Sequence, residues 1–205
     1  MGVDLDTTQL MAIAAALGWA SGLRLYLVVF LTGIAGWLGW VELPAGLKLL
    51  QHPALLGASG FMLFVEFFAD KIPGLDTLWD LVHTVVRIPA GAALAAAVFG
   101  ADQGTWATAA ALIGGTLAAT SHVAKTTTRA AANASPEPFS NLGLSLLGDS
   151  AVPAALWLSW SHPLVFFVAL AVALVVMAGL IWFFAKFLRA LFGRVSGWFA
   201  PGSPA

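Results

Sequence analysis

The stretch EFFADKIPGLDTLWDLVHTVVRIPAG, residues 66–91, decides the fold, because it concentrates charge in a chain that is otherwise strongly apolar. The chain has nine Lys and Arg and ten Asp and Glu, and six of these nineteen residues lie in this stretch. Long apolar runs lie on both sides of it. Charge in such a setting marks either a turn in water or polar groups buried inside a bundle.

The composition identifies an integral membrane protein. Hydrophobic residues make up 60% of the 205 residues, charged residues make up 9%, and the mean hydropathy is +0.91, whereas a soluble domain averages about 25% charged residues. The length allows roughly six spans of about 20 residues. We therefore expect one transmembrane domain over residues 1–205, with the lipid bilayer as its main partner. The net charge of −1 provides no basic surface for nucleic acid.

The first apolar segment is expected to be an interrupted helix. Asp6 and Gln9 have the spacing of a capping box, which predicts a helix start. The apolar run continues to about Trp40, which is about 45 Å of helix and too long for one straight span. Arg24 lies in the middle of the run and predicts a tilt or a break there. Trp37 and Trp40 suit the interface on the far side of the membrane.

The two halves of the chain contain similar short motifs. Short motifs recur in the same order: LGWAS (17–21) with LAATS (117–121), and DKIP (70–73) with DSAVP (149–153). With three spans in each half, at about residues 8–100 and 105–192, the second half would run the opposite way through the membrane, as in many transporters. The prediction is an all-α membrane protein of about six helices, arranged as two inverted three-helix repeats with broken or short helices. Asp70 and Asp149 would mark equivalent turns.

Basic residues support this topology through the positive-inside rule. With six spans and both termini in the cytoplasm, six basic residues fall at or near the cytoplasmic side: Lys71, Lys125, Arg129, Lys186, Arg189 and Arg194. Lys48 falls on the outer side. In the alternative topology, residues 139–160 form a re-entrant hairpin and the chain has five spans, which distributes the basic residues more evenly between the two sides.

Three stretches carry a resemblance to a known family. They are ASGLRLYL, EFFADKIPGLDTLWDLVHTVVRIPAG and KTTTRAAANASPEPFSNLGLSLLGD, and they occur in this order over most of the chain. The chain resembles the family of small bacterial membrane proteins filed as domain of unknown function 4126. The resemblance implies a compact helical bundle in the bacterial inner (cytoplasmic) membrane and supplies no chemistry. Where the family often carries an acidic residue, Gly148 stands here before Asp149, so the resemblance implies no carboxylate pair at that position.

Helical spacing places the charges of residues 66–91 on two helix faces. Glu66 and Asp70 are four residues apart and share one face. A second face, with the spacing i, i+4, i+7 and i+11, passes from acidic to basic: Asp76, Asp80, His83 and Arg87. A solvated turn that contains Asp70 and Asp76 is the simpler alternative for these two residues, and Asp80 with Arg87 also suits a structural ion pair.

The remaining candidate residues lie in the first helix and in the second half. Ser121, Lys125 and Arg129 are spaced i, i+4 and i+8, which suits an aqueous cavity or an anion site, or else a helix end that emerges into the cytoplasm. Ser21 and Arg24 lie in the first span, where Arg24 would be about 20 Å deep and needs a carboxylate partner. The natural partner is Glu66 or Asp70. Asp149 completes a set of ten candidate binding residues.

Three functions are compatible with these features. The inverted repeat favours a small permease or channel-like transporter, proton-coupled through its carboxylates, for a small anionic solute or a lipid headgroup. Asp70, Asp76 and Asp80 also fit an intramembrane Mg²⁺-dependent enzyme acting on a diphosphate or lipid substrate, and Ser121 with Lys125 fits a Ser–Lys dyad. The third is an accessory subunit, whose Ala- and Gly-rich faces would pack on a partner or a second copy of the chain. We prefer the transporter, which needs no catalytic residue, metal or cofactor.

Overall fold

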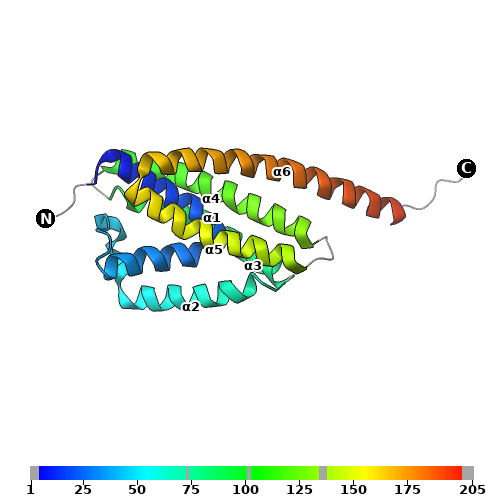
Figure 1. Ribbon diagram of the computed structural model, residues 1–205, viewed down its shortest axis with the longest axis horizontal. Coiled ribbons are helices and arrows are strands. Elements are labelled where there is room, and N and C mark those ends of the chain that lie inside the picture. Colours follow the sequence, from blue (N-terminus) through cyan, green and yellow to red (C-terminus); the bar gives the residue numbers. More distant parts are fainter. Residues whose placement is uncertain (1–4, 73, 101–102, 134–137, 200–205) are drawn as a thin grey trace, which may run out of the picture.

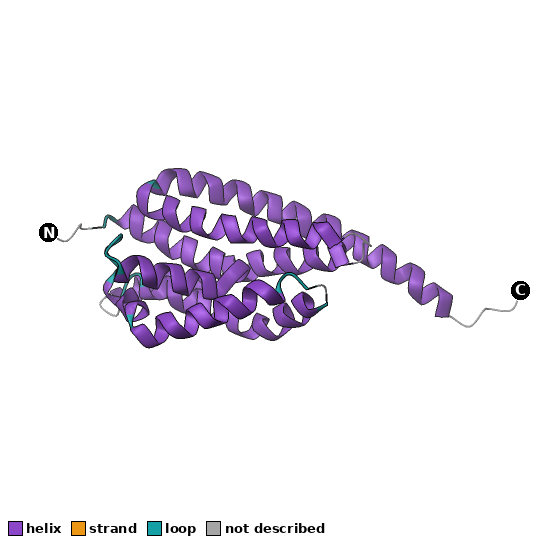
Figure 2. Cartoon of the chain, turned by 60° about the horizontal axis from the view of Figure 1, so that its bottom comes forward, coloured by secondary structure: helices purple, strands orange, loops and turns teal. Residues whose placement is uncertain are grey.

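A computed structural model describes residues 5–72, 74–100, 103–133 and 138–199, and every element in these ranges is a helix. The helices lie along one long axis (Figure 1 and Figure 2). They are α1 (Thr7–Trp37), the 3₁₀ helix η1 (Ala45–Gln51), α2 (Pro53–Ala69), α3 (Leu75–Ala97), α4 (Gly104–Asn133), α5 (Pro138–Ser161) and α6 (Pro163–Phe199). Five helices are long and apolar enough to cross a membrane, and the bent pair of η1 and α2 raises the number to six. The predicted all-α membrane fold is confirmed.

Local sequence accounts for the helix boundaries. The capping box is confirmed, because the Asp6 carboxylate accepts from the Gln9 amide at 2.7 Å and the Gln9 side chain accepts from the Asp6 amide at 3.2 Å. Pro53 and Pro163 each occupy the first position of a helix, where no amide donor is needed. Gly74 has a φ of 86°, a left-handed conformation that permits the tight turn between α2 and α3.

α1 is a helical hairpin that enters the bundle and returns to the end from which it started. Arg24 has extended backbone angles inside the helix, with φ −149° and ψ 84°, so the predicted break is confirmed. Gln9 from the first limb and Thr32 from the second line one pocket together with Trp40. Figure 1 shows both limbs reaching the same end of the molecule. The expectation that Trp37 and Trp40 mark the far interface is therefore wrong.

Each limb of the hairpin is held by a close contact with another helix. A Cβ atom on Gly18 would collide with the backbone of Gly114 in α4, so the first limb and α4 approach as only small residues allow. In the second limb, Phe30 packs against Gly60 of α2. The broken backbone at the tip is thus enclosed by protein, which is the condition for irregular structure at membrane depth.

α5 is one continuous helix from Pro138 to Ser161. Asp149 lies inside it, so the expected turn at Asp149 and the alternative of a re-entrant hairpin at residues 139–160 are both wrong. Asp149 caps no helix, because its carboxylate pairs with a cation instead. The chain is interrupted at His162, since α5 ends at Ser161 and α6 begins at Pro163.

The inverted repeat is not confirmed. The first limb of α1 and α4, which the repeat would pair, run in the same direction: the Ser121 hydroxyl donates to the Trp19 carbonyl at 2.6 Å, and the Lys125 ammonium, one turn later, donates to the Leu23 carbonyl at 3.1 Å. Inverted topology requires opposite directions. Asp70 caps the end of α2, whereas Asp149 lies within a helix, so these two residues do not mark equivalent turns.

Because α1 returns to the end where it starts, five helices, α2 to α6, run from one end of the bundle to the other. This odd number places the two ends of the chain at opposite ends of the bundle. Figure 1 shows the start of α1 at one end of the long axis and the end of α6 at the other. The turn after α2 and the C-terminal halves of α4 and α6 share that second end, and they carry five of the basic residues expected in the cytoplasm: Lys71, Lys125, Arg129, Lys186 and Arg189. The side chain of Arg194 lies outside the described ones. Lys48 lies with the start of α1, and because the two ends of the chain lie at opposite ends of the bundle, the prediction of both termini on the same side of the membrane is wrong.

Candidate functional site

Asp70 is the centre of a buried charge network. It follows the last residue of α2 and is 1% exposed. Its carboxylate lies 3.0 Å from Arg24 Nη1, 3.3 Å from Lys125 Nζ and 2.8 Å from Arg129 Nη1. Asp70 thus joins the tip of α1 to one face of α4. The predicted partner of Arg24 is confirmed, and it is Asp70 rather than Glu66.

A second group of charges surrounds Arg87 of α3. Its guanidinium lies 2.7 Å from Glu66 Oε1 and 2.6 Å from Asp80 Oδ1. All three side chains are buried. The expected ion pair of Asp80 with Arg87 is present, and Glu66 extends it to α2. A guanidinium suits this position because its fork of donors can serve two carboxylates at once.

Lys125 connects the two groups. Its ammonium lies 3.3 Å from Asp70 and 3.0 Å from Asp80. The same ammonium donates to the carbonyl of Leu23, the residue before the break in α1. Lys125 therefore stabilises both the carboxylates and the end of the first limb.

Arg24 also reaches α5. Its Nε lies 2.8 Å from Asp149 Oδ1, and its Nη2 donates to the Ser145 hydroxyl at 2.8 Å. Asp149 is more exposed than the rest of the network, at 22% of its side chain, and lies 3.6 Å from Lys71 Nζ. Lys71 in turn lies over the ring of Phe67. This edge is where the network approaches the surface.

The network contains equal numbers of the two charges. It consists of five carboxylates and five cations, which in chain order are Arg24, Glu66, Asp70, Lys71, Asp76, Asp80, Arg87, Lys125, Arg129 and Asp149. A balanced set of ion pairs is the arrangement in which buried charge is least costly, because each group has an opposite neighbour. Eight of the ten predicted site residues belong to it.

The other two predicted residues, Ser21 and Ser121, lie beside the network and bond to backbone. Ser21 donates to the Leu17 carbonyl and Ser121 to the Trp19 carbonyl. Both are fully buried. Because Ser121 donates to backbone while the Lys125 ammonium contacts carboxylates, the Ser–Lys dyad is not assembled.

The expectation of Asp76 in a solvated turn is wrong, because the structure buries it in the first turn of α3, whose N-cap is Gly74. Its carboxylate accepts from the amides of Gly74 and Thr77 at 2.9 and 2.6 Å, and it lies 3.8 Å from Arg129. Sequence reasoning missed His122, which contacts the Thr84 hydroxyl at 2.7 Å and Arg87 at 3.5 Å. Its position one residue after Ser121 offered a weak signal, because it lies next to the polar stripe.

Two hollows flank the network on either side of α4. The inner cavity, of about 270 Å³, is reached by Arg24, Asp70, Lys125 and Arg129, and its remaining wall is largely apolar side chains of α5 and α6. The threonine groove, of about 350 Å³, lies between α3 and α4 and is lined by Thr77, Thr84, Thr126, Thr127, Asp80 and Arg129. Arg129 borders both hollows, so the network separates two spaces that a polar solute could enter.

The described residues contain no group of three or more His, Asp or Glu side chains arranged to hold a metal ion. Asp70, Asp76 and Asp80, which the enzyme alternative would use for Mg²⁺, each face a cation of the protein. His83 stacks on Trp79, with ring centroids 4.0 Å apart. The arrangement is a buried set of paired charges in an otherwise largely apolar bundle.

Comparison with known proteins identifies the family. No curated protein and no solved structure matches the chain. The family model described as a domain of unknown function (DUF4126) matches residues 11–183, which include every member of the charge network. The chain therefore belongs to this family, as the three sequence stretches indicated.

Proposed function

We propose that the protein is a small permease that carries a small anion, or the anionic headgroup of a lipid, together with a proton. The observation that carries this proposal is the lining of the inner cavity, which contains Arg24, Lys125 and Arg129 but, of the four carboxylates that these cations contact, only Asp70. Asp76, Asp80 and Asp149 contact the cations from outside the cavity wall, so the wall itself is locally positive although the whole network is neutral. The low dielectric of the bundle strengthens the attraction of that wall for an anion.

In this proposal Asp70 occupies the place that the transported anion takes. An anion that enters the cavity competes with Asp70 for Arg24 and Arg129, which now lie 3.0 and 2.8 Å from its carboxylate. A buried carboxylate that loses its cations is more stable when it is protonated. Binding of the anion is then linked to uptake of a proton by Asp70, and the pair crosses the membrane without moving net charge.

The break in α1 supplies the element that can move. Broken helices at membrane depth commonly form the binding sites of secondary transporters, and Arg24 lies at such a break. The opposite wall of the inner cavity carries Ala173, Val176 and Met177 of α6. An apolar wall next to the cations Arg24, Lys125 and Arg129 suits the headgroup and first methylenes of a lipid as well as a free anion.

Transport by the purified protein in proteoliposomes tests the proposal. Two assays distinguish the two sources of the anion: uptake of labelled acetate or phosphate driven by a proton gradient, and transfer of a fluorescent anionic phospholipid between leaflets. We expect activity in one of them, a loss of about tenfold or more in Arg129→Gln, and loss of proton dependence in Asp70→Asn. Lys48→Gln, which changes an exposed lysine at the other end, is the control.

Two results would contradict the permease. One is flux equal to that of protein-free liposomes in both assays. The other is full activity of Arg129→Gln in a protein whose circular dichroism and thermal unfolding match those of the wild type.

A further inference from the structure

The C-terminal half of α6 carries two cations that lie outside the charge network. Figure 1 and Figure 2 show this end of the helix extending beyond the other helices of the bundle. The two cations are Lys186 and Arg189, and both side chains are exposed. Residues 150–205 contain no Asp or Glu, so α6 itself offers neither cation a carboxylate. This end of the helix is therefore positively charged.

A shallow hollow along one face of α6, of about 710 Å³, brings the two cations together with an aromatic ring. It is lined by Ala178, Ile181, Trp182, Ala185, Lys186 and Arg189. Trp182, Lys186 and Arg189 have the spacing i, i+4 and i+7, which places them on one side of the helix. The Lys186 ammonium lies 5.5 Å from the centroid of the Trp182 ring, within the range of a cation–π contact. The ring therefore holds the ammonium beside the hollow.

The depth of the hollow in the membrane follows from the length of α6. The apolar part of the helix runs over Pro163–Phe187. Trp182 follows Pro163 by 19 residues, which is about 28 Å of helix and close to the hydrocarbon thickness of about 30 Å. Trp182 therefore lies at the membrane interface, where tryptophan is enriched. Lys186 and Arg189 follow about one and two turns later, at the depth of the lipid headgroups.

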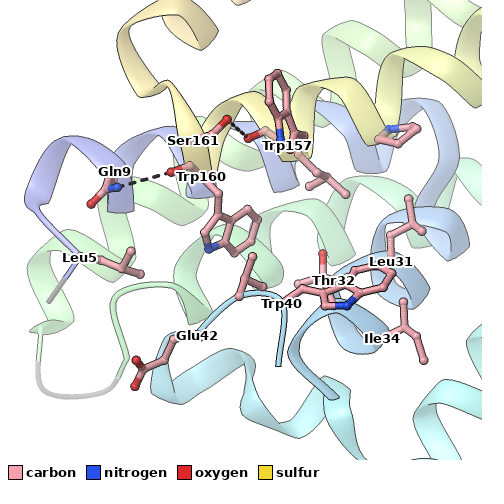
Figure 3. A pocket seen from close by; sticks show the side chains of 14 residues that line it. Leu5, Gln9, Leu31, Thr32, Ile34, Trp40, Glu42, Trp157, Trp160 and Ser161 are labelled. Atoms are coloured by element: carbon pink, nitrogen blue, oxygen red, sulfur yellow. Dashed lines mark hydrogen bonds between the residues drawn. The ribbon is translucent and has the colours of Figure 1, made fainter. Parts of the chain in front are cut away.

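The pocket at the other end of the bundle has a different composition. Figure 3 shows that Trp40, Trp157 and Trp160 gather around it. Among the described residues that line this pocket, Glu42 is the charged one and none is a lysine or an arginine. Tryptophans thus lie at both ends of the bundle, whereas the tryptophan on α6 shares its hollow with two exposed cations. The hollow on α6 therefore suits an anion that lies at the interface.

We propose that the hollow on α6 binds the phosphate of an anionic glycerophospholipid. The Arg189 guanidinium donates to two phosphate oxygens as a fork, and the Lys186 ammonium supplies the second positive charge. An acyl chain of the lipid lies along Ala178 and Ile181, toward the centre of the bilayer. The residues of α6 that line the inner cavity are different ones, on the opposite face of the helix, so this site does not depend on the proposed permease.

Native mass spectrometry of the full-length protein, titrated with lipid in a mild detergent, tests the proposal by counting bound lipids. The probe is dioleoylphosphatidylglycerol, and dioleoylphosphatidylcholine has the same chains without the net charge. We expect one phosphatidylglycerol molecule to be held by the hollow. Lys186→Gln and Arg189→Gln should each weaken its binding about fivefold, and the double variant about thirtyfold. Lys48→Gln, which removes an exposed lysine at the other end of the bundle, is the matched control and should bind as the wild type does.

The count separates this site from the one proposed for transport. A phosphatidylglycerol molecule in the inner cavity stays bound in the double variant, whereas the molecule in the hollow is lost. The same number of tightly bound molecules in the double variant and the wild type would overturn the proposal, as would equal binding of phosphatidylcholine. Loss of the same molecule in Lys48→Gln would show a general effect of charge. Displacement of the lipid by millimolar glycerol 1-phosphate would show a site for free phosphate, and either result would overturn the lipid site.

Discussion

Glu66 and Arg87 form an ion pair in which both side chains are completely buried, with charged atoms 2.7 Å apart. Arg87 is the cation that neutralises Glu66, whereas Asp80, the other partner of Arg87, also lies 3.0 Å from Lys125. Removing Arg87 therefore isolates one carboxylate and leaves the other paired. An isolated buried charge is far more costly than a missing pair, because the desolvation of the survivor is uncompensated.

We expect Arg87→Met to lower the free energy of unfolding by about 3–5 kcal/mol. Arg87→Met combined with Glu66→Gln should be more stable than Arg87→Met alone, because the second change removes the isolated charge. Reversible unfolding of the detergent-solubilised protein, followed by circular dichroism, measures both. Additive losses in the double variant would show that the two residues do not neutralise each other.

At the scale of single residues, helical spacing was an informative guide. The intervals from Glu66 to Asp70, from Asp80 to Arg87 and from Ser121 to Arg129 correctly predicted which side chains share a face, and burial of charge predicted that these faces meet. The exact pairings could not be predicted, since partner choice depends on how the helices cross. The roles of Asp76 and Lys71 could not be predicted for the same reason. The sequence of a turn is the same whether its charged residues face water or belong to a buried network of ion pairs.

At the scale of elements, the return of α1 is the feature with the clearest experimental signature. The chain has no cysteine, so a single introduced thiol reports one position without background. Thr8→Cys and Trp40→Cys change exposed residues at the two ends of the hairpin. A membrane-impermeant maleimide should label both from the same side of a sealed vesicle, and should label Ile72→Cys, which changes an exposed residue in the turn after α2, from the other side. Labelling of Thr8→Cys and Trp40→Cys from opposite sides would show that α1 crosses.

The contact between α1 and α4 depends on glycine. A Cβ at Gly18 would collide with the backbone of Gly114, and neither backbone can move away without displacing its helix. We expect Gly18→Ala to lower the free energy of unfolding by about 1–3 kcal/mol, as overpacked cores do. Gly179→Ala is the matched control, because its Cβ meets nothing within 4 Å; it should be neutral or slightly stabilising, since alanine favours a helix. Equal unfolding temperatures of the two variants would contradict the close packing.

Hydropathy could not distinguish a helix that crosses from one that returns. Residues 7–37 are apolar and long in either case, and the difference rests on the backbone angles of Arg24 and on two packing contacts far away in sequence. The wrongly predicted turn at Asp149 has a similar origin. An aspartate before an apolar run is typical of a helix cap, but here its partner is Arg24, which only the tertiary structure brings close.

At the scale of the whole molecule, the distribution of basic residues predicts the orientation in the membrane. The end that carries Lys71, Arg129 and Lys186 should face the cytoplasm. Alkaline phosphatase fused after Gly100 should then be active, and green fluorescent protein fused after residue 205 should fluoresce. The same fluorescent protein fused before residue 1 and exported through the general secretion pathway should not. The reverse pattern would show that the molecule is inserted the other way round.

The position of Arg24 also has a consequence for how the protein is made. The ribosome completes the α1 segment first, yet two of the groups that stabilise its tip arrive much later: Asp70 follows α2, and Ser145 is synthesised 121 residues after Arg24. At about 5–20 residues per second this delay is on the order of ten seconds. Asp70 is made 46 residues after Arg24, whereas Ser145 and Asp149 of α5 follow more than 120 residues after it. The guanidinium therefore has its full set of partners only once α5 is made, so we expect the nascent first segment to wait at the insertion machinery and to enter the bundle after α5. The segment that is translated first is then among the last to reach its final place.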